Sequence, residues 1–163
     1  MQIHGSIHQF PKELKITILI FVAALSIGFY GGLSFVNSTT SVQPSGIEMH
    51  YLGNEADEDA DIMKFKKSKH EILSIVHNHI LSLSVIFFLL SVLLSTTSLS
   101  KKWKYILMIE PFISVFFTFG GIYFLWSGIT WVKYIIIVSG VLMTLSFIAA
   151  TLSIYYQILI VKK

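Results

Sequence analysis

Histidine is the first residue type to consider for chemistry, because the chain has six histidines and no cysteine. His77 and His79 flank Asn78 at the start of a long apolar run, and His50 and His70 precede them. Imidazole is the nitrogen ligand that a haem or a metal would find here, and its charge changes near neutral pH. Side chains two residues apart on a helix point about 200° apart, so His77 and His79 do not hold one ion from the same face.

Two interpretations of these histidines follow. A haem b needs axial ligands from opposite sides of its ring, so His77 would pair with His50 or with a histidine from a second copy of the chain. The sequence therefore predicts a tentative non-covalent haem site of His77, His79 and His50, with His70 as a further candidate. The alternative is a set of interfacial histidines that bind headgroups, water and loop carbonyls. No HxxxH pair occurs in this segment, and no metal site is expected.

Glu110 is the one acidic residue well inside a predicted membrane span, about 8 Å along the helix from Tyr105. An ionisable side chain at that depth is a functional candidate. The alternative is a protonated or lysine-paired residue near the inner interface, with Lys104 or Lys101 as its partner and Pro111 kinking the helix. The histidine pair lies toward the other side of the membrane, so a shared site is not expected.

The elements that must position these residues are membrane helices. The 163 residues are 54% hydrophobic and 13% charged, which is too apolar for a soluble domain. Four apolar runs are long enough to cross a bilayer: 14–36, 80–99, 105–126 and 132–160. The sequence predicts an all-α integral membrane protein with an N-terminal tail (1–13), one transmembrane helix and a three-helix bundle over 77–163. The first run exceeds a usual signal-peptide core, so a signal anchor is expected.

Residues 37–76 form the only sizeable polar segment. It opens with turn residues, and after Asn54 acidic residues precede apolar residues at roughly helical spacing. Asn54 suits a helix N-cap, and acidic residues suit a helix start. The pattern predicts an extracytoplasmic segment with an amphipathic surface helix over about 55–76 that continues into the second span.

The lysines predict the orientation. All twelve basic residues are lysines, and the net charge is +3. With both termini in the cytoplasm, seven lysines lie inside and five outside, which follows the positive-inside rule; the reverse orientation is the alternative. The lysines sit at helix ends rather than along a stripe, so nucleic acid is not an expected partner.

Small residues predict where helix backbones approach closely. They occur in three of the four spans, at Gly28, Gly32, Gly120, Gly121 and Gly140. The second span instead carries a polar residue every seven positions, which would face the bundle interior or bond back to its own helix carbonyls.

Several short motifs carry a resemblance to a known group: Tyr51-Leu52-Gly53-Asn54, His77-Asn78-His79, Phe87-Phe88, Glu110-Pro111-Phe112 and Gly120-Gly121. Over residues 46–157 the chain resembles uncharacterised small bacterial inner-membrane proteins with the same one-plus-three helix layout. Longer members carry a CxxCH-type c-haem motif in the extracytoplasmic segment, so the resemblance implies a place near electron transfer. Because the chain has no cysteine, covalent haem is excluded, and only the scaffold with its histidine pair carries over.

Functions of different classes remain open. A non-catalytic accessory or scaffold subunit of a larger bacterial membrane complex needs the fewest assumptions, because no clear nucleophile, phosphate loop or paired ligands are visible. The alternative is a redox-associated module that binds a non-covalent haem or a quinone near the outer face. A small oligomeric transporter is a third hypothesis. The expected partners are the lipid bilayer and other membrane subunits or further copies of the chain.

Overall fold

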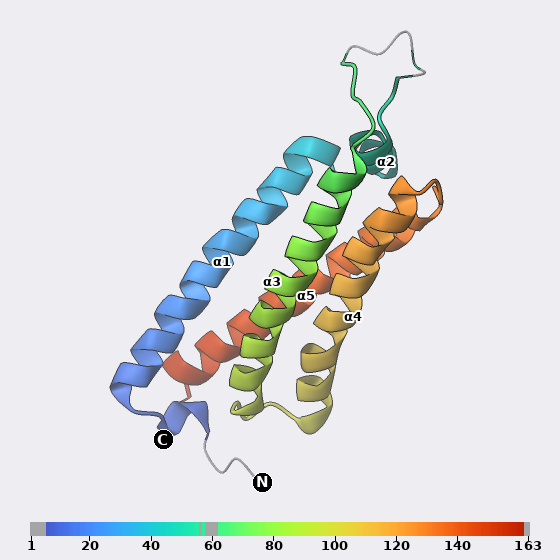
Figure 1. Cartoon of the computed structure of the whole chain (residues 1–163). Coiled ribbons are helices and arrows are strands. Elements are labelled where there is room, and N and C mark those ends of the chain that lie inside the picture. Colours follow the sequence, from blue (N-terminus) through green and yellow to red (C-terminus); the bar gives the residue numbers. More distant parts are fainter. Residues whose placement is uncertain (1–5, 56, 58–61, 162–163) are drawn as a thin grey trace.

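The structure, a computed structural model, describes residues 6–55, 57 and 62–161. Its elements are a 3₁₀ turn η1 (Ile7–Gln9) and the helices α1 (Lys12–Thr40), α2 (Pro44–Leu52), α3 (Lys69–Ser95), α4 (Lys101–Trp126) and α5 (Val132–Leu159) (Figure 1). Four of these, α1, α3, α4 and α5, are long and apolar enough to cross a bilayer. The predicted fold class, an all-helical membrane protein with four transmembrane helices, is confirmed.

Helices α3, α4 and α5 form the packed bundle. Short connections join them, so each runs antiparallel to the next (Figure 1). Their shared interface is filled by buried apolar side chains such as Phe87, Val115 and Phe147. The rings of Phe87 and Phe147 meet edge to face, with centroids 6.3 Å apart.

Helix α1 lies beside this bundle rather than within it (Figure 1). Only 11% of its apolar window is buried, compared with 39% for the windows of α4 and α5. Two contacts join it to α5: the rings of Phe29 and Phe147 stack at 4.0 Å, and the Tyr155 hydroxyl donates to the Leu19 carbonyl at 3.3 Å. Most of the surface of α1 is therefore left to lipid.

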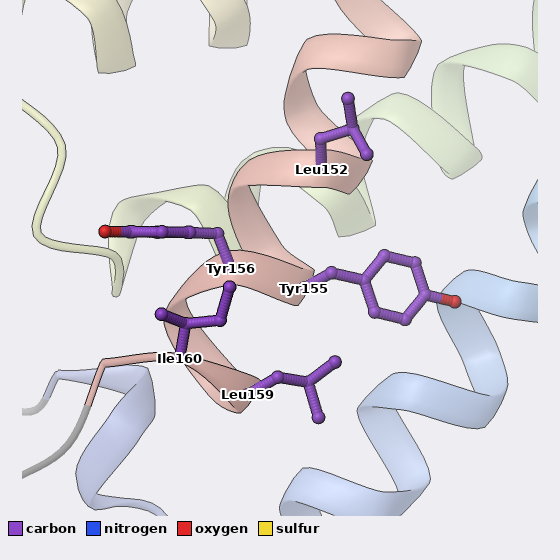
Figure 2. Close-up of a pocket in the computed structure, with 5 residues that line it drawn as sticks. All are labelled: Leu152, Tyr155, Tyr156, Leu159 and Ile160. Atoms are coloured by element: carbon purple, nitrogen blue, oxygen red, sulfur yellow. The ribbon is translucent and has the colours of Figure 1, made fainter.

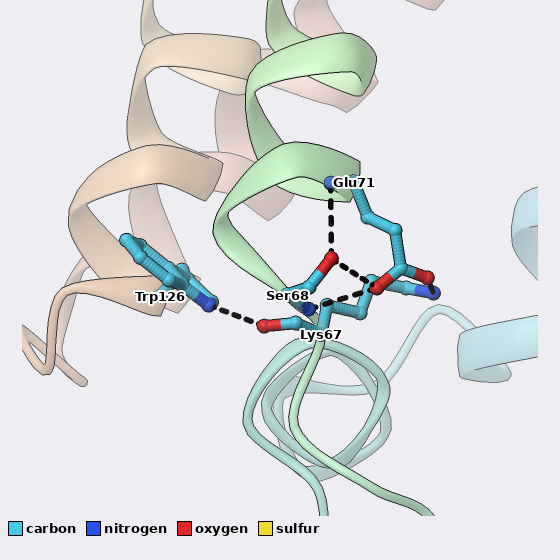
Figure 3. Close-up of polar contacts among 4 residues, drawn as sticks. All are labelled: Lys67, Ser68, Glu71 and Trp126. Carbon is cyan, nitrogen blue, oxygen red and sulfur yellow. Dashed lines mark hydrogen bonds and ion pairs between the residues drawn. The ribbon is translucent and has the colours of Figure 1, made fainter.

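The predicted amphipathic helix over about 55–76 is wrong. The surface helix is α2, with Pro44 in its first turn, and residues 62–68 are not helical. The next helix begins at Lys69 because Ser68 and Glu71 form a capping box: the Ser68 hydroxyl accepts from the Glu71 N–H, and the Glu71 carboxylate accepts from the Ser68 N–H (Figure 3). Residues 56 and 58–61, where most of the acidic run falls, lie outside the described residues.

Asn54 is not a helix N-cap either. Its side-chain oxygen accepts from the Lys64 N–H at 2.6 Å, and its amide donates to the Ile62 carbonyl at 3.0 Å. The same short polar side chain that suits a cap also suits a loop, because it can bond to any nearby backbone. Here it joins the two sides of the loop between α2 and α3.

The N-terminal tail contributes to the core. Ile7, in η1, is completely buried, and its N–H donates to the Thr96 carbonyl at 2.9 Å. Thr96 lies at the end of α3, so η1 covers the end of the bundle where α5 finishes (Figure 1).

Of the five glycines predicted at packing positions, Gly121 has a close neighbour. A Cβ atom there would meet Cγ1 of Ile136 at 2.8 Å, so α4 and α5 approach closely at this point. A Cβ atom added at any of the other four would meet open space: Gly28, Gly32, Gly120 and Gly140. Those four glycines make no close backbone approach within the described part of the chain.

Candidate functional site

Glu110 lies in α4, about nine residues or about 14 Å past the start of the helix at Lys101. Both of its carboxylate oxygens accept a hydrogen bond: the Ser114 hydroxyl donates to Oε1 and the Ser146 hydroxyl donates to Oε2. Ser114 is one helical turn further along α4, whereas Ser146 belongs to α5. The carboxylate is therefore held between two helices.

The hydroxyl groups continue along the same interface. Thr118 follows Ser114 by one turn, and its hydroxyl lies 2.7 Å from the hydroxyl of Ser139 in α5. The Ser139 hydroxyl also donates to the Ile135 carbonyl at 2.7 Å. We refer to these residues as the polar seam: Glu110, Ser114, Thr118, Ser139 and Ser146. All four hydroxyl residues are buried.

The lysine partners considered for Glu110 do not approach it. Lys104 donates instead to the Ser95 carbonyl at 2.9 Å, which holds the start of α4 to the end of α3. Within the described residues the ion pairs join Lys67 to Glu71 and Lys133 to Glu48. The counterparts of the Glu110 carboxylate are therefore two neutral hydroxyls.

A groove of about 510 Å³ opens beside the polar seam. Glu110, Ser114 and Ser139 contribute its polar atoms, and apolar or aromatic side chains of α4 and α5, such as Phe117 and Tyr134, form the rest of its wall. Several wall residues are exposed on the outer surface of the spanning helices. The groove therefore faces the lipid, and Glu110 is accessible from that side.

A second, smaller pocket of about 340 Å³ lies at the end of α5. Its lining is apolar apart from two tyrosine hydroxyls, and the side chains of Tyr155 and Tyr156 point to opposite sides of the helix (Figure 2). Tyr155 bonds to α1, so this region joins helices. It carries no group of side chains suited to acid–base or ligand chemistry.

Three of the four predicted histidine ligands lie on α3, and the fourth, His50, lies on α2. His77 and His79 are exposed on α3, and the ring of His79 stacks on Phe119 of α4 with centroids 4.6 Å apart. Nδ1 of His79 also lies 2.8 Å from the Ile75 carbonyl. His70 is exposed in the first turn of α3. Among the residues that the structure describes, no group of three or more His, Asp or Glu side chains is arranged to hold a metal ion.

His50 is half-buried in α2. Its ring packs edge-on against Tyr51 with centroids 4.8 Å apart. Burial, together with the positive charges of Lys67 and Lys64, lowers the pKa of His50. Burial also raises the pKa of Tyr51 to about 12. Both side chains are therefore neutral at pH 7, which suits a helix packed onto the bundle.

The loop between α2 and α3, which we call the arm (residues 53–68), is anchored at its base. Gly53 has φ 79°, and a Cβ there would meet the Lys64 carbonyl oxygen at 2.7 Å, so glycine is required by both conformation and space. The Lys67 N–H donates to the Tyr51 carbonyl at 3.2 Å. The indole N–H of Trp126 donates to the Lys67 carbonyl at 2.7 Å, which ties the arm to the end of α4 (Figure 3).

Beyond this base the arm exposes apolar side chains. The exposed fractions are 69% for Ile62, 49% for Met63 and 74% for Phe65. The described parts of the arm extend past the ends of the transmembrane helices (Figure 1). These three side chains therefore lie on a polar segment outside the spans.

Sequence analysis identified Glu110 but missed the polar seam and the exposed side chains of the arm. Part of the polar seam has a sequence signal: Glu110, Ser114 and Thr118 follow one another at intervals of four residues, which puts their side chains on one face of a helix. The contribution of Ser146 had no sequence signal, because it depends on how α5 is rotated against α4.

Taken together, the fold defines a multi-pass membrane protein in which a helical bundle holds one carboxylate between two spans. The chain belongs to the Aq_1264_TM family, a transmembrane helical domain that it matches over residues 41–163. The matched region contains α2 to α5 and leaves out α1, the helix with the fewest contacts to the bundle. No curated protein and no solved structure matches the chain. The resemblance to a family of small membrane proteins is confirmed at this level.

Proposed function

We propose that the protein is a non-catalytic accessory subunit of a larger complex in a bacterial inner membrane, with its termini in the cytoplasm, and that the arm binds the partner. The observation that carries this proposal is the exposure of Ile62, Met63 and Phe65 on the arm. Exposed apolar side chains on α1, α3, α4 and α5 are explained by lipid. The three on the arm belong to a segment whose described parts extend past the helix ends, where water would surround their side chains (Figure 1).

Burial against a partner would make these side chains favourable. Fully burying a large apolar side chain contributes roughly 1.5–3 kcal/mol. Lys64 and Lys66 alternate with these apolar residues in the sequence, but their ammonium groups contact the spanning helices: Nζ of Lys64 donates to the Thr39 carbonyl at 3.3 Å, and Nζ of Lys66 lies 5.3 Å from the centroid of the Trp126 ring. A second membrane protein with an extracytoplasmic apolar surface fits this chemistry.

The arm is also held in place before any partner arrives. Its base is fixed by the backbone bond from the Asn54 N–H to the Lys64 carbonyl, at 2.9 Å, and by the two bonds of the Asn54 side chain. Trp126 adds a bond from α4. Preorganisation of this kind lowers the entropy lost on binding.

Polar side chains elsewhere support a structural role. Lys133 of α5 pairs with Glu48 of α2, and Gln157 of α5 accepts from the backbone and side chain of Ser98, at 3.2 and 2.8 Å. The ion pair joins α5 to α2, and the bonds of Gln157 join α5 to the connection between α3 and α4. These polar side chains therefore stabilise the fold.

The test is site-specific photo-crosslinking in native membranes. A benzophenone side chain at position 65 should give one protein adduct, and the protein in that adduct should copurify with the wild type but not with Phe65→Ser. Ile129, an exposed apolar residue of the α4–α5 turn on the same side, provides the matched control: the probe at 129 should give no such adduct, and Ile129→Ser should retain the partner. Adducts to lipid alone at position 65 would refute the proposal and assign the arm to the membrane surface.

The alternative proposal is a redox-associated module with a non-covalent haem. Its support is the exposed imidazole of His77, which is free to serve as an axial ligand to a haem iron. The ring of His79, in contrast, is stacked on Phe119. Oxidised and reduced absorption spectra of protein from haem-replete cells test it. A Soret band lost in His77→Ala and kept in His70→Ala would favour haem, and a colourless protein would exclude it.

A further inference from the structure

We propose that Glu110 binds a proton inside the membrane, and that its carboxyl group is reached from the lipid-facing side through the groove between α4 and α5. This inference does not depend on the accessory-subunit role. It rests on the surroundings of the carboxyl group in the polar seam and on the shape of the groove.

The position of Glu110 requires a counter-charge or a proton. A carboxylate taken out of water into an apolar medium is strongly disfavoured unless it is paired. The ion pairs of the described residues do not include Glu110, and Tyr134 is the other titratable side chain that lines the groove. A bound proton neutralises the carboxyl group without any partner.

The two serines allow the group to exist in both protonation states. While Glu110 is ionised, the Ser114 and Ser146 hydroxyls each donate to one of its oxygens, which stabilises the negative charge. After proton uptake, one carboxyl oxygen becomes a donor. A serine hydroxyl can rotate to accept from it, because a hydroxyl group both donates and accepts. The carboxyl group can therefore form a hydrogen bond with a serine hydroxyl in either state.

The seam favours binding of a proton over conduction of protons across the membrane. Beyond Thr118 and Ser139, α4 and α5 meet at the tight contact between Gly121 and Ile136. The buried residues that follow in α4 are Ile122 and Leu125, both apolar. The described part of the polar seam therefore ends within the membrane. Glu110, Ser114 and Ser139 of the seam line the groove, which opens on the outer surface of α4 and α5.

Dicyclohexylcarbodiimide, a lipid-soluble reagent, tests this inference on the full-length protein in liposomes. A protonated carboxyl group adds across one N=C bond of the carbodiimide: its proton passes to nitrogen and its oxygen bonds to the central carbon. The acyl group then migrates to nitrogen, which leaves a stable N-acylurea, and no atom is lost. Peptide mapping should locate one adduct at Glu110 in the wild type and none in Glu110→Gln. Glu71→Gln, which changes an exposed carboxylate at the start of α3, should keep the adduct.

The pH dependence separates a proton-binding role from simple accessibility. Labelling should decline as the pH rises, because only the protonated carboxyl group adds to the carbodiimide. Absence of the Glu110 adduct in the wild type at every pH, or labelling that does not change with pH, would overturn the inference. Protection by Na⁺ but not K⁺ at constant pH would also overturn it, because the ligand would then be a metal cation. Mapping in the wild type decides the matter even if one variant fails to fold.

Discussion

Replacing Asn54 by alanine should loosen the arm without unfolding the bundle. The Asn54 side chain makes two of the bonds that join the two sides of the arm, to the Lys64 N–H at 2.6 Å and to the Ile62 carbonyl at 3.0 Å. The backbone bond from the Asn54 N–H to the Lys64 carbonyl does not need the side chain and remains in the variant. The expected effect is local opening of the arm.

The size of the effect follows from the two bonds. The bond to Lys64 is partly buried, and a bond of this kind contributes about 1 kcal/mol. The bond to Ile62 is exposed, so water replaces it at little cost and its contribution is at the low end of the range, about 0.5 kcal/mol. The sum lies between about 1 and 2 kcal/mol, which corresponds to a factor of roughly 5–30 in the equilibrium between closed and open arm.

Amide hydrogen exchange at Lys67 measures this opening, because the Lys67 N–H donates to the Tyr51 carbonyl at 3.2 Å and this bond does not involve the Asn54 side chain. Lys64 is not suitable, because Asn54→Ala removes the acceptor of its own N–H. Exchange at Lys67 should become roughly 5–30 times faster in Asn54→Ala, while amides within α4 and α5 keep their rates. Asn54→Asp is the matched control, because it keeps the oxygen that accepts from Lys64 and loses only the exposed donor. Its Lys67 exchange rate should stay closer to that of the wild type. Equal rates in the wild type and in Asn54→Ala would show that the backbone bonds alone hold the arm and would refute the reasoning.

Three further predictions concern packing, charge and pH. Gly121→Ala should lower the free energy of unfolding by about 1–3 kcal/mol because the new Cβ meets α5, whereas Gly120→Ala should be neutral or slightly stabilising; equal thermal midpoints of the two variants would contradict this. Lys133→Met and Glu48→Gln should each lower the midpoint of thermal unfolding, and the double variant should lower it by less than the sum of the two; a thermal double-mutant cycle without coupling would be evidence against the ion pair. Because burial and nearby lysines lower the pKa of His50, packing of α2 should be constant above about pH 6.5 and weaken as the pH falls below it, since the released imidazole takes up the proton first. Amide exchange in α2 should show this loss in the wild type, and His50→Gln should be insensitive to the same change of pH.

The spanning helices could be predicted because a membrane leaves few alternatives. Within lipid, an apolar run of about twenty residues must satisfy its backbone internally, which a helix does. The ends of the helices were harder to place. The second span was predicted at 80–99, but α3 begins at Lys69 because the capping box lies in the polar segment, beyond the apolar pattern.

The polar segment itself was misinterpreted for a physical reason. Acidic residues followed by apolar residues at helical spacing are typical of a helix start. The described residues of the loop form a different structure, in which Asn54 bonds to the backbone of Ile62 and Lys64. Gly53 reverses the chain at positive φ, and Asn54 then bonds across to Lys64, ten residues away in the sequence. A contact of that separation has no local signature.

The candidate site also contains one residue that could be predicted from the sequence and one that could not. Glu110 could be identified from one sequence, because depth in the membrane is a property of position along the chain. Ser146 lies thirty-six residues away and is selected by the rotation of α5, which depends on side-chain packing across the whole α4–α5 interface. Residues that act together across helices therefore became visible only in the structure.

The α4–α5 pair links the two features to which a role is assigned. The arm is tied to it by Trp126 of α4, and α2 is tied to it by the ion pair of Lys133 in α5 with Glu48. The polar seam lies between the same two helices, with Glu110 bonded to Ser146 across the interface. A change in the fit of α4 against α5 would therefore act on the base of the arm as well as on the carboxyl group.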